Sequence, residues 1–224
     1  MINETISSGR STVLRKNDSH ELIITINKKR LQDIFIINGN SFKTKDISRK
    51  DLNIKQNEYY MIINRGHIPL DIHYDQNISH HSILYNPYKY ENSKKINLTL
   101  GEFIERYEIS KNYIDTLPKW YSFKFTYNNY NLIFVRAEFG LSIQSHKHRS
   151  EFWEIMGGTP IVITGGKVHY FVNEGIKFKT PKNTYHSIIN VNVDINDFVI
   201  VKEEWQGRFD ENDINRIFNP NRYY

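Results

Sequence analysis

The sequence contains no cysteine. This absence excludes disulfide bonds, thiolate metal ligands and cysteine nucleophiles, and it says little about the compartment. The sequence also has no apolar N-terminal segment and no hydrophobic run long enough to cross a bilayer. We therefore expect a soluble, cytoplasmic protein with no membrane partner. The 224 residues suffice for one large domain or two small ones.

Positive charge is present but not concentrated. There are 30 basic and 25 acidic residues, which give a formal net charge of +5, and the basic residues are scattered along the chain. A net positive charge favours anionic partners, from nucleic acids to sugar phosphates. No Gly-Phe cluster typical of an RNA-binding sheet accompanies it. Compositional bias explains the charge better than a nucleic-acid surface, so we expect no nucleic-acid partner.

The segment from residue 140 to 190 combines three histidines and a glutamate at suggestive spacings. His146 and His148 are two residues apart, so on a β-strand their side chains would leave the same face. Glu151 follows shortly, and His186 lies in a second segment that begins at Gly175. Three imidazoles and one carboxylate suit zinc, manganese, iron, cobalt or nickel better than calcium or magnesium. We expect a single divalent transition metal on these four residues, with zinc as the first choice.

The two segments resemble the paired motifs of the cupin superfamily. Two departures are visible: only two residues separate His148 from Glu151, and Asn183 replaces a turn glycine, a mild change because asparagine tolerates left-handed backbone. The resemblance implies an all-β double-stranded β-helix, or jelly-roll barrel. The residues that match the cupin pattern are Gly140, His146, His148, Glu151, Gly158, Gly175, Pro181, His186 and Asn190.

The short spacing after His148 is similar to that of type II mannose-6-phosphate isomerases. The stretch from His146 to Trp153 resembles their His-x-His-Arg-(Ala/Ser)-Glu-His-Trp signature, and residues 211–216 resemble their terminal acidic segment. The similarity runs from about Trp120 to Arg216. Nothing resembles the Gly-rich nucleotide-binding segment of the guanylyltransferase domain that precedes this part in many relatives. We therefore expect no nucleotide transfer.

An internal repeat appears at an offset of 126 residues without gaps. The segment Ile37-Asn-Gly-Asn matches Ile163-Thr-Gly-Gly, and Tyr-x-x-Ile-Ile-Asn follows in both halves. The first half would then be a degenerate cupin without metal, unless the alignment is an accident of composition. The offset aligns each candidate ligand with a residue of the first half: His146 with His20, His148 with Leu22, Glu151 with Thr25, and His186 with Tyr60.

The region between the two halves has a different character. Thr99-x-x-Glu102 is a capping-box pattern, and the apolar residues that follow it have helical spacing. We expect one amphipathic helix from 99 to about 115, closed by Pro118. The expected organisation is a degenerate cupin-like domain over 1–85, a linker with this helix over 86–118, and a metal-binding cupin domain over 119–224.

The resemblance implies a metal-dependent aldose–ketose isomerase that acts on a phosphorylated sugar. The first expectation is the conversion of mannose 6-phosphate to fructose 6-phosphate. A base must move a proton between adjacent carbons, and Glu151 and His169 are both candidates. Arg216 is a candidate for stabilising substrate charge. Either Lys124 or Arg136 could meet a phosphate, with solvated surface as the alternative for both. Alternatives are another cupin enzyme, such as a dioxygenase or a sugar-nucleotide isomerase, or a non-catalytic sugar-binding cupin. The sequence leaves open a homodimer, the exact metal, and whether Trp153 is a sugar platform or core.

Overall fold

A computed structural model describes residues 2–210 and 212–222. Glu211, in the segment that resembles the terminal part of the isomerases, lies outside the described residues. The chain divides into two compact units: residues 1–86 with 165–169, and residues 87–164 with 170–224. In the described part of the chain, no helix is long and apolar enough to span a membrane.

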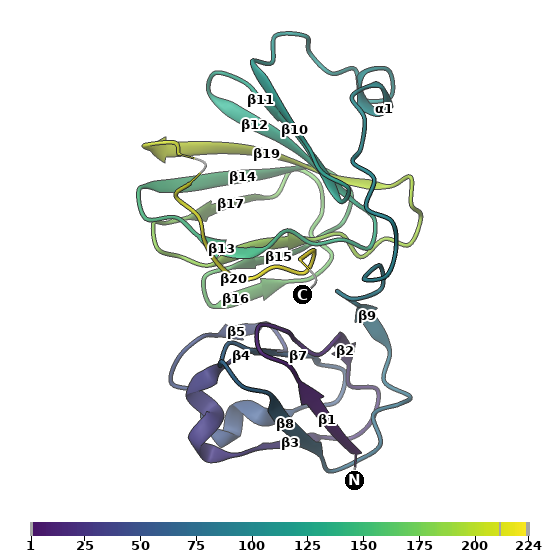
Figure 1. Ribbon diagram of the computed structural model, residues 1–224, viewed down its shortest axis with the longest axis vertical. Helices are drawn as coiled ribbons and strands as arrows, with labels where there is room; N and C mark the ends of the chain where they lie inside the picture. The colour runs from purple at the N-terminus through teal and green to yellow at the C-terminus, as the bar shows by residue number, and fades with distance from the viewer. Residues whose placement is uncertain (1, 211, 223–224) are drawn as a thin grey trace. The chain divides into compact units, whose positions relative to one another are not determined.

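The first unit is built from short antiparallel strands (Figure 1). One sheet has the order β1 (Ile2–Ile6), β8 (Leu70–Tyr74), β3 (Leu22–Ile26) and β6 (Asn53–Ile54). The other has the order β5 (Ser41–Lys43), β4 (Ile34–Asn38), β7 (Tyr59–Asn64), β2 (Leu14–Lys16) and β9 (Ile83–Tyr85). The 3-10 helices η1 (Lys28–Asp33) and η2 (Arg49–Leu52) and strand β16 (Lys167–His169) complete the unit.

Alternation of apolar and polar residues explains why these strands pack as they do. In β3 the side chains of Leu22, Ile24 and Ile26 are buried while Ile23 and Thr25 are exposed. Strand β8 repeats the same pattern. Because side chains on a strand alternate between faces, each strand turns one apolar row into a shared core.

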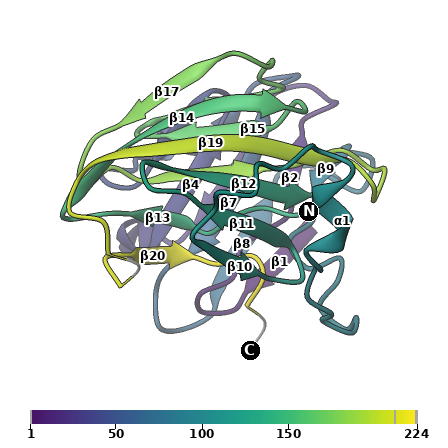
Figure 2. The ribbon, with the colours of Figure 1, turned by 90° about the horizontal axis from the view of Figure 1, so that it is seen from above.

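The second unit is also built from two antiparallel sheets, and Figure 2 shows its neighbouring strands β14, β17 and β19. One sheet has the order β10 (Asp115–Pro118), β11 (Ser122–Thr126), β12 (Tyr130–Arg136), β19 (Phe198–Gly207), β14 (Arg149–Gly157) and β17 (Lys177–Thr180). The other has the order β20 (Asn215–Phe218), β13 (Ile143–Ser145), β18 (His186–Ile189) and β15 (Ile161–Thr164). The predicted all-β cupin fold is confirmed.

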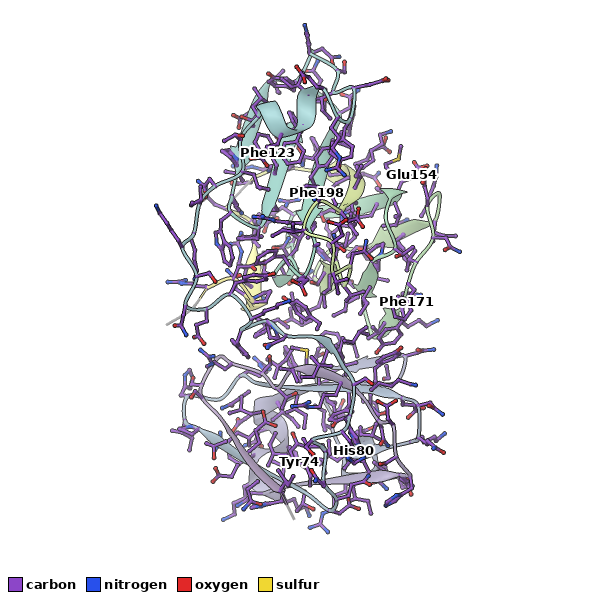
Figure 3. The ribbon with its side chains drawn as sticks, turned by 90° about the vertical axis from the view of Figure 1, so that its right-hand side faces the viewer. Tyr74, His80, Phe123, Glu154, Phe171 and Phe198 are labelled. Carbon is purple, nitrogen blue, oxygen red and sulfur yellow. The ribbon has the colours of Figure 1, made fainter. Side chains whose placement is uncertain are left out.

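Two apolar clusters among the described residues of the second unit position the site. The one inside the barrel gathers inward side chains such as Val135, Trp153 and Val199. The other cluster packs Phe103 against Phe123, Phe134 and their neighbours, and Figure 3 labels Phe123 and Phe198. Strand β11 therefore has apolar side chains on one face, which frees its other face for the polar residues Ser122 and Lys124.

The predicted helix over 99–115 is wrong in its extent. Helix α1 covers only Gly101–Ile104, and strand β10 already begins at Asp115. The Thr99 hydroxyl donates to the Glu102 carboxylate at 3.0 Å instead of capping a backbone amide. Glu108 has a φ of +49°, which is left-handed backbone that an α-helix excludes. A single turn of α-helix is therefore enough to pack Phe103 against the sheet, and Tyr107 packs there from the turn that follows.

Strand pairings support the predicted internal repeat and correct its register. Ile37 pairs with Met61 as Ile163 pairs with Ser187, which preserves the offset of 126. Ile24 pairs with Tyr74 as Trp153 pairs with Glu203, which requires an offset of 129. The repeat is therefore not free of gaps, because short loop changes separate the two groups of strands.

The corrected register changes which residues correspond to the candidate ligands. Leu22 pairs with Ile54 as Glu151 pairs with Thr180, so Leu22 corresponds to Glu151 and not to His148. The carbonyl of Asn17 accepts from Asn57 N as that of His146 accepts from Asn183 N, both at 2.7 Å. Asn17, not His20, thus corresponds to His146. Tyr60 corresponds to His186, as predicted.

Candidate metal centre and adjoining pocket

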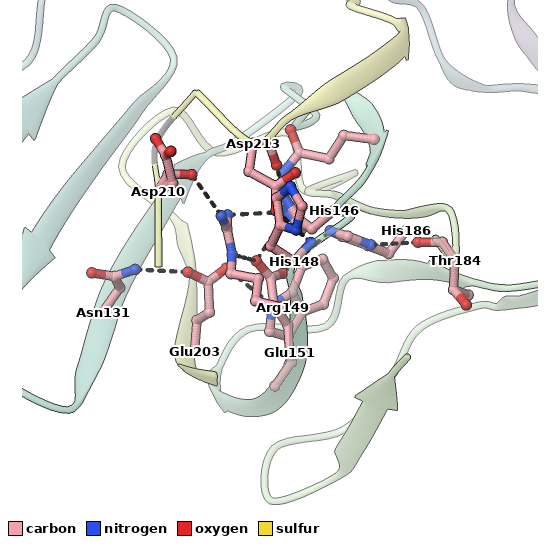
Figure 4. A network of polar contacts seen from close by, with 12 residues as sticks. Asn131, His146, His148, Arg149, Glu151, Thr184, His186, Glu203, Asp210 and Asp213 are labelled. Atoms are coloured by element: carbon pink, nitrogen blue, oxygen red, sulfur yellow. Dashed lines mark hydrogen bonds and ion pairs between the residues drawn. The ribbon is translucent and has the colours of Figure 1, made fainter. Parts of the chain in front are cut away.

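His146, Glu151 and His186 converge inside the second unit (Figure 4). Glu151 lies on the inward face of β14, His186 begins β18, and His146 lies in the bend that precedes β14. All three are buried, and their ligand atoms lie within 4.8 Å of one another. The structure thus brings together three of the four predicted metal ligands.

The two imidazoles are oriented by backbone carbonyls. His146 Nδ1 donates to Asp213 O, and His186 Nδ1 donates to Thr184 O at 3.0 Å. A carbonyl only accepts, so Nδ1 carries hydrogen in both rings and Nε2 faces Glu151. His146 Nε2 lies 3.0 Å from Glu151 Oε1, and His186 Nε2 lies 3.2 Å from Glu151 Oε2. Metal-binding histidines in proteins are typically held in this way.

The unsatisfied atoms of the cluster fit a bound cation. Glu151 Oε2 and His186 Nε2 are buried without a hydrogen-bond partner among the described residues. Burial alone would raise the pKa of Glu151, yet the adjacent imidazoles of His146 and His186 hold that pKa well below its ordinary value. A carboxylate that stays ionised beside two imidazole nitrogens is a suitable donor set for a divalent transition metal.

Arg149 enters the same cluster. It is buried, and its Nε donates to Glu151 Oε1 at 2.8 Å while Nη1 donates to Asp210 O at 2.8 Å. Its Nη2 lies 3.2 Å from His146 Nε2. The guanidinium therefore places a positive charge beside the Glu151 carboxylate inside the buried cluster. If residues 148 and 149 lay on one regular strand with His148 facing inward, Arg149 would face outward. The structure shows Arg149 facing inward instead.

His148 does not join the cluster, although the spacing predicts it as a ligand. It is exposed and lies with Lys147 in the bend between β13 and β14, so the same-face rule for strands does not apply. The carboxylate of Asp213 holds this bend by accepting from Lys147 N at 3.0 Å and His148 N at 2.8 Å. Sequence reasoning missed Asp213; its place in the terminal acidic segment was the available signal.

The other two predicted catalytic residues, Arg216 and His169, belong to different units. Arg216 lies on β20, opposite Gln144 of β13, and lines a pocket of the second unit. His169 lies on β16, in the part of the chain assigned to the first unit, and is not one of the residues lining this pocket. Burial and the nearby charge of Lys167 lower the pKa of His169. The role of His169 as an acid or base stays a prediction.

The pocket is lined mainly by polar and cationic side chains. Arg149 is shared between the pocket and the cluster, so the two adjoin. Trp153 is almost fully buried, with Nε1 donating to Glu203, so it is a core residue with a polar contact. The charged lining residues are Lys119, Lys124, Arg149, Glu203 and Arg216, and the polar ones are Tyr121, Ser122, Ser142 and Gln144.

Comparisons with solved structures give distant similarities. A cupin-superfamily sugar phosphate isomerase from Silicibacter pomeroyi is 14% identical over 40% of this chain and 60% of its own, with a TM-score of 0.33. A putative sugar phosphate isomerase from Acidithiobacillus ferrooxidans is 14% identical over 52% and 60%, with a TM-score of 0.32. The capsular polysaccharide assembling protein CapF from Staphylococcus aureus is 10% identical over 56% and 34%, with a TM-score of 0.37. Similarities at this level carry no argument about function.

A search of curated proteins gives no match. The chain does match a protein family, described as "Mannose-6-phosphate isomerase C-terminal", over residues 120–219. This region contains all three residues of the cluster and nearly the whole lining of the pocket. The resemblance of this part of the chain to the C-terminal cupin domain of the mannose-6-phosphate isomerases is therefore confirmed.

Proposed function

We propose that the protein is a metal-dependent aldose–ketose isomerase that converts mannose 6-phosphate to fructose 6-phosphate in the cytoplasm. The observation that carries this proposal is the pocket in which four cationic side chains and one buried carboxylate adjoin the His146–Glu151–His186 cluster. Such a pocket suits a small, polar, anionic substrate. The match to the isomerase family over residues 120–219 supports the same reaction class.

The cationic side chains have distinct places in the proposed site. Lys119, Lys124 and Arg216 come from three different segments and line the pocket. Their charges would bind the phosphate and orient the sugar chain, with its carbonyl end toward the cluster. Arg149 donates to Glu151 and also lines the pocket, so it is suited to neutralise negative charge that develops on the substrate oxygens.

His146, Glu151 and His186 would hold the metal. A metal bound there would polarise the substrate carbonyl and acidify the adjacent C–H bond. We expect zinc, with manganese, cobalt, iron and nickel as alternatives. His146 and His186 keep their Nε2 atoms directed to this point because their Nδ1 atoms are bound to backbone carbonyls.

The test starts from protein freed of metal with a chelator and reloaded with zinc, cobalt or manganese. Formation of fructose 6-phosphate from mannose 6-phosphate is then followed in a coupled assay, beside glucose 6-phosphate and unphosphorylated mannose. Turnover of mannose 6-phosphate that depends on added metal is the expected result. Binding without turnover would favour a sugar-binding cupin, whereas oxygen uptake by the iron-loaded protein would favour a dioxygenase.

A further inference from the structure

A second buried carboxylate lies beside the candidate metal centre. Glu203 is on the inward face of β19, in line with Val199 and Val201. It is only 6% exposed, yet it lines the pocket with Lys124, Arg149 and Arg216. An ionisable side chain in an apolar row is costly, so its position calls for a function.

Two uncharged groups hold the Glu203 carboxylate in place. Asn131 Nδ2 donates to Oε1 at 2.7 Å, and Trp153 Nε1 donates to Oε2 at 3.1 Å (Figure 4 shows the Asn131 contact). In the described part of the chain, no hydrogen bond or ion pair links Glu203 directly to His146, Glu151 or His186. The carboxylate is thus fixed at the pocket wall independently of the metal ligands.

Both protonation states of Glu203 can be accommodated. Burial, together with the negative charge of Glu151, raises the pKa of Glu203 to about 7, against the lowering effects of Asn131, Lys124 and Arg149. Asn131 Oδ1 is buried and has no hydrogen-bond partner among the residues that the structure describes. A rotation of the Asn131 amide by half a turn would present this oxygen to a protonated Glu203. One amide therefore serves as a donor to the carboxylate or as an acceptor from the acid.

We propose that Glu203 is the catalytic residue that carries the proton between C1 and C2 of the sugar phosphate, an inference that rests on the isomerase function proposed above. The carboxylate takes the proton from C2, the C–H electron pair forms the C1–C2 double bond, and the carbonyl π pair moves onto O1. The C1–C2 π pair then takes the proton back from the acid to form the C1–H bond, the O2–H pair becomes the C2 carbonyl bond, and the O2 proton passes to O1. Atoms and charge balance without an external reactant.

Glu203 suits this role better than the two residues that the sequence offered. Glu151 is held by His146, His186 and Arg149, and a carboxylate of lowered pKa is a weak base. His169 does not line the pocket. Glu203 combines a fixed position at the pocket with the capacity to gain and lose a proton near neutral pH.

The test compares zinc-loaded wild type with Glu203→Gln, Glu203→Ala and a matched control, Glu204→Gln. Glu204 is the next residue on β19, is exposed and faces the opposite side. Metal content is measured by elemental analysis, and binding of mannitol 6-phosphate, which has no carbonyl, by calorimetry. Turnover of mannose 6-phosphate is measured in deuterated water, with NMR detection of deuterium at C1 and C2.

We expect Glu203→Gln to keep its metal and to bind mannitol 6-phosphate within about threefold of wild type, while turnover falls by roughly 10²–10⁴-fold. Deuterium incorporation should fall with it, Glu204→Gln should match wild type, and added formate should restore part of the activity of Glu203→Ala. If wild type is active and Glu203→Gln keeps more than a tenth of the wild-type rate, the role of Glu203 is overturned while the isomerase function stands. A metal-loaded wild type that binds mannitol 6-phosphate but turns over no hexose phosphate would overturn the isomerase function and this role with it.

Discussion

At the scale of single residues, the candidate centre depends on the distribution of charge around Glu151. Two imidazoles and the Arg149 guanidinium surround its carboxylate within 3.2 Å. The guanidinium and a metal ion would both neutralise this one carboxylate. Arg149 binds Oε1, so Oε2 is the carboxylate oxygen that remains for a metal.

Replacing single histidines should distinguish a metal ligand of the cluster, His186, from His148, which lies outside it. His186→Ala removes a buried ligand, so metal affinity should fall by at least about 100-fold. His148→Ala removes an exposed ring outside the cluster and should leave affinity within about threefold. Titration with zinc against a competing chelator measures both. Equal losses in the two variants would contradict the three-residue site and favour the four-ligand site expected from the spacing.

Glu203 should make the stability of the metal-free protein depend on pH. Its carboxyl titrates near 4.5 in an unfolded chain and near 7 in the fold, so the folded state binds more protons in between. Its contribution therefore destabilises the fold progressively as pH rises from about 4.5 to about 7. The groups that face it are Lys124 on β11, Asn131 on β12, and Arg149 and Glu151 on β14.

Glu203→Gln removes this titration. Relative to wild type, the free energy of unfolding of the variant should rise by about 3 kcal/mol between pH 4.5 and pH 8. Urea unfolding with chelator present measures the difference at each pH, and Glu204→Gln provides the control with no such change. A difference that stays constant across this range would show that Glu203 keeps an ordinary pKa in the fold.

At the scale of elements, the bend before β14 is shaped by the strand beside it. Arg149 pairs with Gly207 at the end of β19, where the glycine has a φ of 113°. A Cβ at this position would clash with the carbonyl oxygen of His148 and lie 3.2 Å from the Arg149 Cα. Glycine at 207 thus lets the two backbones approach, which fixes the bend that carries His146 and turns Arg149 inward.

Gly207→Ala should therefore affect both stability and the metal centre. Strain and the clash should cost about 1–3 kcal/mol in the free energy of unfolding, and metal affinity should fall as His146 shifts. Chemical unfolding and a zinc titration measure the two effects. Gly101→Ala is the control, because a Cβ there meets no atom within 4 Å. Unchanged stability and zinc affinity in Gly207→Ala would show that the bend does not need this close approach.

At the scale of the whole molecule, the two units repeat one pattern of strand pairing with different residues at the ligand positions. Asn64 and Asn190 show how close the correspondence is. Asn64 Nδ2 donates to Ile6 O and Ile68 O, and Asn190 Nδ2 donates to Val135 O and Asp197 O. We infer that the first unit is a cupin that lacks a metal centre, because Asn17, Leu22 and Tyr60 occupy the positions of His146, Glu151 and His186.

This inference predicts one metal ion per chain. Zinc-loaded protein should contain about one equivalent by elemental analysis, because Leu22 and Tyr60 offer no carboxylate or imidazole. His186→Ala should contain close to none after the same treatment. Two equivalents in wild type, or one that persists in His186→Ala, would contradict the assignment of the single centre to the second unit.

Local sequence patterns were enough to predict the fold class and most of the centre. Alternating apolar residues and turn residues specify short strands, since side-chain direction on a strand follows a period of two. The spacings of His146, Glu151 and His186 sufficed to predict a shared site. The repeat was also visible, because the hairpin around Gly39 and Gly165 and the Tyr-x-x-Ile-Ile-Asn segment keep one offset.

The neighbours that complete the centre come from segments far apart in the chain, and strand packing brings them together. A bend held by Asp213 turns His148 outward and Arg149 inward, and sequence spacing cannot reveal a break in strand alternation. Glu203 lies 52 residues after Glu151 and reaches the pocket only because β19 pairs with β14. The loop changes that moved the register of the repeat are equally invisible to a gap-free alignment. Each of these depends on contacts between distant segments, and so on the packing of the strands and not on their local patterns.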